Sequence, residues 1–69
     1  MSSTDNPNAA NNAGITPIHN AAENGHVEIV RLLMPSTDNL NAANNDGQTP
    51  ISLAAANGHV EIVQLLVFH

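Results

Sequence analysis

The side chains of this chain with the most capacity for chemistry are four histidines and a few hydroxyl groups. His19 and Glu23 are four positions apart, a spacing that can place two metal ligands on one face of a helix. Thr49 and Ser52 could supply a nucleophile, but the sequence places no general base beside either of them. The chain also has no cysteine, no glycine-rich phosphate loop and no His-Glu-x-x-His motif. We therefore expect no metal site, no cofactor and no enzymatic activity.

The chain repeats itself with a period of 33 residues. Residues 3–35 and 36–68 align without gaps and differ at nine of the 33 positions. A constant period of this length is typical of stacked arrays of small units. His19 aligns with Ser52, so the position does not require a metal ligand. An array presents an extended surface, which favours binding of a partner over chemistry in a pocket.

Each unit carries the signals for two short helices. The Thr-Pro pairs at residues 16–17 and 49–50 combine an N-cap with the residue favoured at the first helical position, so helices are expected to begin at both prolines. The Asn-Gly pairs at residues 24–25 and 57–58 predict where these helices end, because glycine adopts the left-handed conformation that stops a helix. Polar turns rich in asparagine and ending in glycine precede each first helix.

An apolar stripe at helical spacing follows each Asn-Gly pair. In the first unit it comprises Val27, Val30, Leu33 and Met34, widened by Ile29 and Leu32. In the second unit it comprises Val60, Ile62, Val63, Leu65, Leu66 and Val67. Pro35 prevents the first of these helices from continuing. The pattern predicts two antiparallel helix pairs, each covering an apolar flank of its neighbour.

The composition limits the partners. One arginine and no lysine stand against six acidic residues, for a net charge of −5. This balance argues against binding to nucleic acid or to an anionic membrane, which both need a basic surface. No apolar run is long enough to span a bilayer, and no secretory signal is visible at the N-terminus. The absence of cysteine fits a reducing compartment, so we expect an intracellular, cytoplasmic location.

Two blocks of sequence resemble the ankyrin repeat family. Gly-Ile-Thr-Pro-Ile-His at residues 14–19 is similar to the family's G-x-T-P-L-H, and residues 21–33 are similar to its A-A-x-x-G-H-x-E-I-V-x-L-L. The second copy repeats both blocks, with serine in place of the helix histidine. The resemblance implies an all-α ankyrin-repeat solenoid of stacked helix pairs with projecting β-hairpin-like fingers. We divide the chain into an N-terminal tail (1–7), a first repeat (8–35), and a linker finger with a second repeat (36–69).

The resemblance also implies a function, which is non-catalytic binding of a protein partner through the fingertips and first helices. The implied contact positions are Asn12, Ala13, Ile15, Glu23, Asn24, Asn45, Asp46, Gln48, Ala56 and Asn57. The implied turn and cap positions are Gly14, Thr16, Pro17, His19, Gly25, His26, Gly47, Thr49, Pro50, Gly58 and His59. Among these, the histidine of the first block pins the turn by hydrogen bonds in the family. His26 and His59 follow a loop glycine and are expected to brace the loop by bonding to the backbone.

The chain departs from the family pattern at three places. The residue that opens each fingertip is usually aspartate in the family and is Asn11 or Asn44 here. Thr37 stands where the family has a glycine, which would cost about 1 kcal/mol if a positive φ were kept there, unless Pro35 reshapes the link. Asn20 stands where the family has a buried leucine, which is tolerable only at an exposed end of the stack.

A second interpretation remains open, in which the chain is a structural piece or spacer of a longer array with no partner of its own. Arrays usually need three or more units and polar capping units. Four apolar side chains are expected to lie uncovered on the outer side of the second repeat: Val60, Ile62, Leu66 and Phe68. We expect partial unfolding, or self-association through this uncapped C-terminal end.

Overall fold

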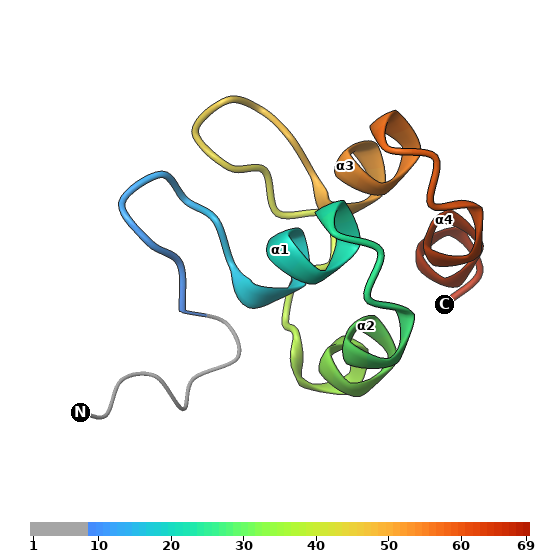
Figure 1. Cartoon of the computed structure of the whole chain (residues 1–69). Coiled ribbons are helices and arrows are strands. Elements are labelled where there is room, and N and C mark those ends of the chain that lie inside the picture. The colour runs from blue at the N-terminus through green and yellow to red at the C-terminus, as the bar shows by residue number, and fades with distance from the viewer. Residues whose placement is uncertain (1–8) are drawn as a thin grey trace.

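The computed structural model describes residues 9–69, which form two stacked pairs of helices (Figure 1). The first pair is α1 (Pro17–Glu23) and α2 (Val27–Leu33), and the second is α3 (Pro50–Ala56) and α4 (Val60–Val67). No strand occurs within residues 9–69, which confirms the all-helical prediction. The expected N-terminal tail (1–7) lies outside the described residues.

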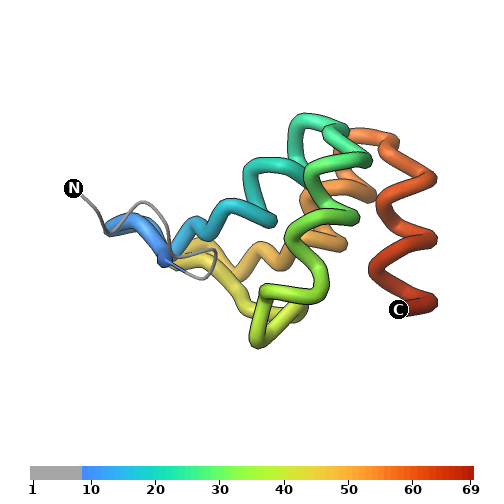
Figure 2. The backbone as a smooth tube through the Cα atoms, turned by 90° about the horizontal axis from the view of Figure 1, so that it is seen from below, coloured from blue at the N-terminus to red at the C-terminus, as the bar shows by residue number. Residues whose placement is uncertain are grey.

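The loops that precede α1 and α3 form two fingers that extend from the same side of the helices. They lie side by side in Figure 1, and Figure 2 shows both of them projecting away from the stacked helix pairs. The first helices α1 and α3 contact each other, and each also contacts the second helix of its own repeat. The molecule therefore has a layer of first helices that carries the fingers and a layer of second helices behind it.

The first helices begin and end at the predicted signals. Thr16 and Thr49 precede them with extended backbone, and a proline occupies the first helical position in both. Past their C-terminal ends, Gly25 and Gly58 have φ values of 76° and 75°. Such values strain a residue that has a Cβ atom, so glycine is required for each helix to turn sharply into the next one.

The core lies between the two layers and between the two repeats. Its fully buried side chains are small or β-branched, so the helices can approach closely. The buried residues of this cluster are Ile18, Ala21, Ala22, Val30, Ala54, Ile62 and Leu66.

The link between the repeats avoids the strain that a missing glycine could have caused. After α2 the chain forms a 3₁₀ turn, η2 (Met34–Ser36), which contains Pro35. Thr37 then has φ −97° and ψ 119°, an ordinary extended conformation, and its hydroxyl donates to the Leu33 carbonyl at 2.7 Å. All non-glycine residues in the described range have negative φ. Pro35 thus reshapes the link, and the cost attached to a positive φ at Thr37 does not arise.

The expected uncovered surface at the C-terminal end was partly wrong. Ile62 is fully buried and Leu66 is 6% exposed, whereas Val60 and Phe68 are 65% and 81% exposed. Ile62 and Leu66 belong to the same buried cluster as residues of the first repeat, so they face inward. Only two of the four side chains are uncovered as expected.

The apolar stripe of α2 is narrower than predicted. Ile29 is 46% exposed and Leu32 is 74% exposed, although both were expected to widen the buried stripe. The corresponding residues of the second repeat, Ile62 and Leu65, are buried and partly buried. The second repeat has a helix pair in front of it, and the described part of the first repeat has none, which explains the difference. Asn20 is exposed for the same reason, while its counterpart Leu53 is buried.

Candidate protein-binding surface

Each fingertip is organised by the asparagine that opens its turn. The Asn44 side-chain oxygen accepts hydrogen bonds from the backbone N–H groups of Asp46 and Gln48, both at 2.9 Å. The backbone of Asn44 also pairs with that of Gln48 at 2.8 Å, which closes the turn. A side chain that replaces a backbone acceptor in this way fixes a tight turn.

The first finger repeats this arrangement 33 residues earlier. The Asn11 side-chain oxygen accepts from the N–H groups of Ala13 at 2.8 Å and Ile15 at 3.0 Å. Gly14 and Gly47 complete the two turns with φ values of 77° and 79°. From the sequence, Asn11 and Asn44 are expected at the start of the two fingertips, where the family has aspartate, but the organising role of their side chains was not predicted.

The two fingertips are tied together by Asn45. Its backbone N–H donates to the Ala13 carbonyl at 2.8 Å, and its side-chain NH₂ donates to the Asn12 carbonyl at 2.9 Å. The side chain is expected to contact a partner, and one N–H of its amide is used between the fingers. The fingers consequently form one continuous edge.

His19 connects the base of the first finger to that of the second. Its Nδ1 accepts from the Thr16 N–H at 3.1 Å and lies 2.7 Å from the Thr16 hydroxyl. Because a backbone N–H can only donate, Nδ1 is the acceptor, and the ring proton lies on Nε2. Nε2 therefore donates to the Gln48 carbonyl, 3.1 Å away, and the ring is completely buried.

Ser52 replaces His19 in the second repeat and makes only the local half of this arrangement. Its hydroxyl oxygen accepts from the Thr49 N–H at 2.8 Å, and Thr49 accepts from the Ser52 N–H at 3.2 Å. This reciprocal pair is a capping box. Within residues 9–69 the hydroxyl group of this serine forms hydrogen bonds with Thr49 alone, and the side chain is exposed.

His59 makes a second link between the repeats, at the opposite end of the first helices. Its Nε2 lies 3.0 Å from the Glu23 carbonyl, to which it donates. The ring lies against Gly25, where an added Cβ would come within 2.7 Å of the ring carbon Cε1. Gly25 therefore provides space for His59 as well as the helix-ending turn. His26, the equivalent residue of the first repeat, is exposed.

The predicted contact residues line the fingers and the C-terminal ends of the first helices. Nine of the ten are exposed, and Ile15 is half-buried. Besides Asn45, two of them have a structural role as well. The side-chain NH₂ groups of Asn24 and Asn57 donate to the carbonyls of Asn20 and Leu53 at 2.9 and 2.8 Å. These bonds cap the last turns of α1 and α3, and each uses one N–H of the side-chain amide.

The charges divide between the two layers. Glu23 and Asp46 are exposed carboxylates on the side of the fingers and first helices. The single arginine, Arg31, lies on α2 and pairs with Glu61 of α4 at 3.3 Å. The finger side is therefore acidic without a compensating Lys or Arg.

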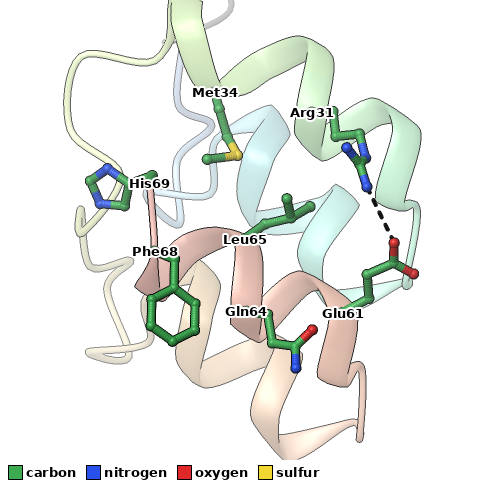
Figure 3. Close-up of a pocket in the computed structure, with 7 residues that line it drawn as sticks. All are labelled: Arg31, Met34, Glu61, Gln64, Leu65, Phe68 and His69. Carbon is green, nitrogen blue, oxygen red and sulfur yellow. Dashed lines mark hydrogen bonds and ion pairs between the residues drawn. The ribbon is translucent and has the colours of Figure 1, made fainter.

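A shallow hollow of about 300 Å³ lies in the layer of second helices, and sequence analysis did not predict it. Figure 3 shows Met34, Leu65 and Phe68 around it, with the Arg31–Glu61 pair at one side. The remaining lining residues are Gln64 and His69. No sequence pattern indicates a hollow at this place. The sequence shows only that Arg31 aligns with Gln64, so the second repeat has no equivalent arginine.

The described residues contain no cluster of three or more His, Cys, Asp or Glu side chains that could hold a metal ion. Likewise, no helix within this range has the length and hydropathy needed to cross a membrane. His19 and Glu23, the pair with metal-binding spacing, differ in environment, since the first is buried and hydrogen-bonded at both nitrogens while the second is exposed.

The family comparison agrees with this geometry. The family model described as ankyrin repeats (3 copies) matches residues 2–69. No curated protein matches the chain in sequence. The match covers nearly the whole chain, including both helix pairs and both fingers. The chain therefore belongs to the ankyrin repeat family, whose domains are typically protein-binding modules and usually non-catalytic.

Proposed function

We propose that this chain binds a protein partner through the edge formed by its two fingertips and the adjoining ends of α1 and α3. The observation that carries the proposal is the pair of bonds from Asn45 to the first fingertip. They join the tips of two fingers that His19 already links at their bases, so a partner meets a surface that is already ordered. A preorganised surface loses less conformational entropy when it binds.

The chemistry of this surface favours a partner that presents cationic and hydrogen-bond-donating groups. Glu23 and Asp46 supply carboxylates, and the amide oxygens of Asn24 and Asn57 add neutral acceptors. Ile15 is the one aliphatic anchor among the contact positions. Because Trp, Tyr and Arg dominate most strong interfaces and none is present here, two repeats alone are expected to bind weakly.

Pull-down experiments with variants that exchange residues between the two repeats test this proposal. Ile15→Gln and Asp46→Ala each install the residue that the other repeat carries at the same position, so both should fold. We expect both variants to lose a captured partner while their helical circular dichroism stays unchanged.

Arg31→Gln is the matched control, because it makes the same kind of exchange in the layer of second helices, away from the fingers. It should retain the partner. If the control loses the partner and the finger variants keep it, binding occurs on the other side of the molecule. If the unmodified chain captures no partner, the chain acts as a spacer.

We also propose an intracellular, cytoplasmic location, which the absence of cysteine supports. Fractionation of cells that express the chain would check it. Recovery of the chain from the medium or from a membrane pellet would contradict it.

A further inference from the structure

Several equivalent positions carry the same residue type but are buried in one repeat and exposed in the other. The positions that are more exposed in the first repeat lie on one face, and those that are more exposed in the second repeat lie on another. On one side, Ile29 is 46% exposed where Ile62 is fully buried, and Leu32 is exposed where Leu65 is partly buried. Pro17 is also less buried than Pro50. We call this surface of the first repeat, formed by Pro17, Ile29 and Leu32, the head face.

The reverse difference marks a second surface. Ala22 is fully buried where Ala55 is exposed, and Val30 is fully buried where Val63 is half-buried. Val27 is half-buried where Val60 is 65% exposed. We call this surface of the second repeat, formed by Ala55, Val60 and Val63, the tail face.

We propose that the chain associates head to tail with a second copy of itself, with the head face of one copy seated on the tail face of the other. The junction between the two repeats of one chain already joins the counterparts of these faces. The apolar residues of both faces are identical in type to those counterparts, so the intermolecular contact continues an interface that the fold contains. The inference does not depend on the fingers binding a partner.

The hydrogen bonds of the internal junction can also recur between copies. Within the chain, Asn45 donates to the Asn12 and Ala13 carbonyls, and His59 donates to the Glu23 carbonyl. Asn12 and His26 stand at the donor positions on the head side and are exposed. Their acceptors in a second copy would be the backbone carbonyls of Asn45, Asp46 and Ala56. Asp46 and Ala56 differ in side chain from their counterparts in the first repeat, but a backbone carbonyl accepts the bond in either case.

Three substitutions weaken the contact between copies relative to the internal junction. Ser52 replaces His19 and loses its bond to the next finger, and Asn20 replaces the buried Leu53. Between copies, Gln64 would take the place of Arg31, and Glu28 of the second copy would take the place of Glu61. The ion pair is thereby replaced by a contact between an amide and a carboxylate. Association is therefore weaker than the contact between repeats and depends on concentration.

The arrangement is heterologous, because a face of one copy meets a different face of the next. Each added copy leaves one head face and one tail face free, so the assembly is open-ended unless its ends meet. This separates the proposal from a symmetric dimer formed by two tail faces, in which no further copy could bind.

Two blocking variants of the full 69-residue chain test the proposal by sedimentation velocity over a range of concentrations. Ile29→Glu blocks the head face, and Ala55→Glu blocks the tail face. Both positions are exposed in the single chain, but their counterparts are fully buried in the junction, so the glutamates should prevent stacking and allow folding. The unmodified chain should grow beyond a dimer with concentration, and each variant alone should stay monomeric.

Mixing the two variants gives the decisive result. Ile29→Glu keeps a free tail face and Ala55→Glu keeps a free head face, so an equimolar mixture should form a dimer and nothing larger. A symmetric tail-to-tail dimer would instead persist in Ile29→Glu alone, and that outcome overturns the proposal. A monomeric unmodified chain at every concentration, with intact helical circular dichroism, also overturns it.

Ala56→Glu is the matched control for added charge. Its counterpart, Glu23, stays exposed beside the internal junction, so a glutamate at 56 should leave association unchanged. In the other direction, Ser52→His and Gln64→Arg restore the junction residues and should each shift assembly to lower concentration. If restoring both has no effect on assembly, the contact is not the one proposed.

Discussion

Ile29 and Ile62 occupy the same position of the same helix in repeats that differ at only nine positions, yet one is 46% exposed and the other is fully buried. The reverse holds for Ala22, which is fully buried, and Ala55, which is exposed. The residue type is constant in each pair, so the neighbouring repeat decides the burial. In such an array the interface between units stabilises each unit, and the two outward faces keep the apolar residues of an interface.

The largest difference between the repeats is expected from truncating the paired isoleucines. Ile62→Ala should destabilise the chain by about 2–4 kcal/mol because it opens a cavity in the shared core. Ile29→Ala removes a side chain that is already half in solvent, so its cost should be below about 1 kcal/mol. Urea unfolding followed by circular dichroism measures both values at low protein concentration. Equal losses in the two variants would show that the repeats do not cover each other as described.

Exchanging the residues at 19 and 52 should give the next largest difference. His19→Ser removes a buried ring and its bond to the Gln48 carbonyl, at a cost of about 2 kcal/mol. Ser52→His adds a ring at an exposed position with no neighbouring finger in the same chain, so stability should change little. Thermal melts of the two variants check this. A melt of His19→Ser that coincides with that of the unmodified chain would contradict the role assigned to the link.

A comparison of alanine substitutions at Gly25 and Gly58 distinguishes the cost of backbone strain from the cost of a steric contact. Gly25→Ala and Gly58→Ala both place a Cβ at positive φ, which costs about 1 kcal/mol in each case. Only Gly25→Ala also pushes against the His59 ring, so it should cost about 1 kcal/mol more. Denaturant midpoints of the two variants give the comparison. A larger loss in Gly58→Ala would mean that the ring is not held against Gly25.

The ion pair between the second helices should matter least. Arg31 and Glu61 are 51% and 61% exposed, so solvent screens their attraction. Arg31→Gln should lower stability by about 0.5 kcal/mol or less, and raising the salt concentration should remove the difference. Denaturation at low and high salt measures it, and a loss that survives high salt would point to packing of the arginine stem.

Much of the fold was predictable because its signals are local. The Thr-Pro starts, the Asn-Gly ends and the 33-residue period depend on neighbours in sequence, and α1 and α3 begin at Pro17 and Pro50 as expected. The side of each apolar stripe that is covered depends on the next repeat in space. The exposure of Ile29 and the burial of Ile62 were both misjudged for that reason.

The finger surface was predictable in outline only. The positions implied by the family resemblance lie on the fingers and the first helices, and nearly all are exposed. The sequence does not tell that the Asn45 side chain is used between the fingers or that Asn24 and Asn57 cap helices. An asparagine can donate to a partner or to its own backbone, and only the geometry separates the two.

Thiol labelling of single-cysteine variants tests most directly that the neighbouring repeat determines burial. The chain contains no cysteine, so Ile29→Cys, Ile62→Cys, Ala22→Cys and Ala55→Cys each report one position. At low protein concentration, cysteines at 29 and 55 should react near the rate of an unfolded chain, and cysteines at 62 and 22 should be protected. Equal labelling rates at 29 and 62, or at 22 and 55, would contradict the account. So would protection of both cysteines of one repeat with exposure of both cysteines of the other.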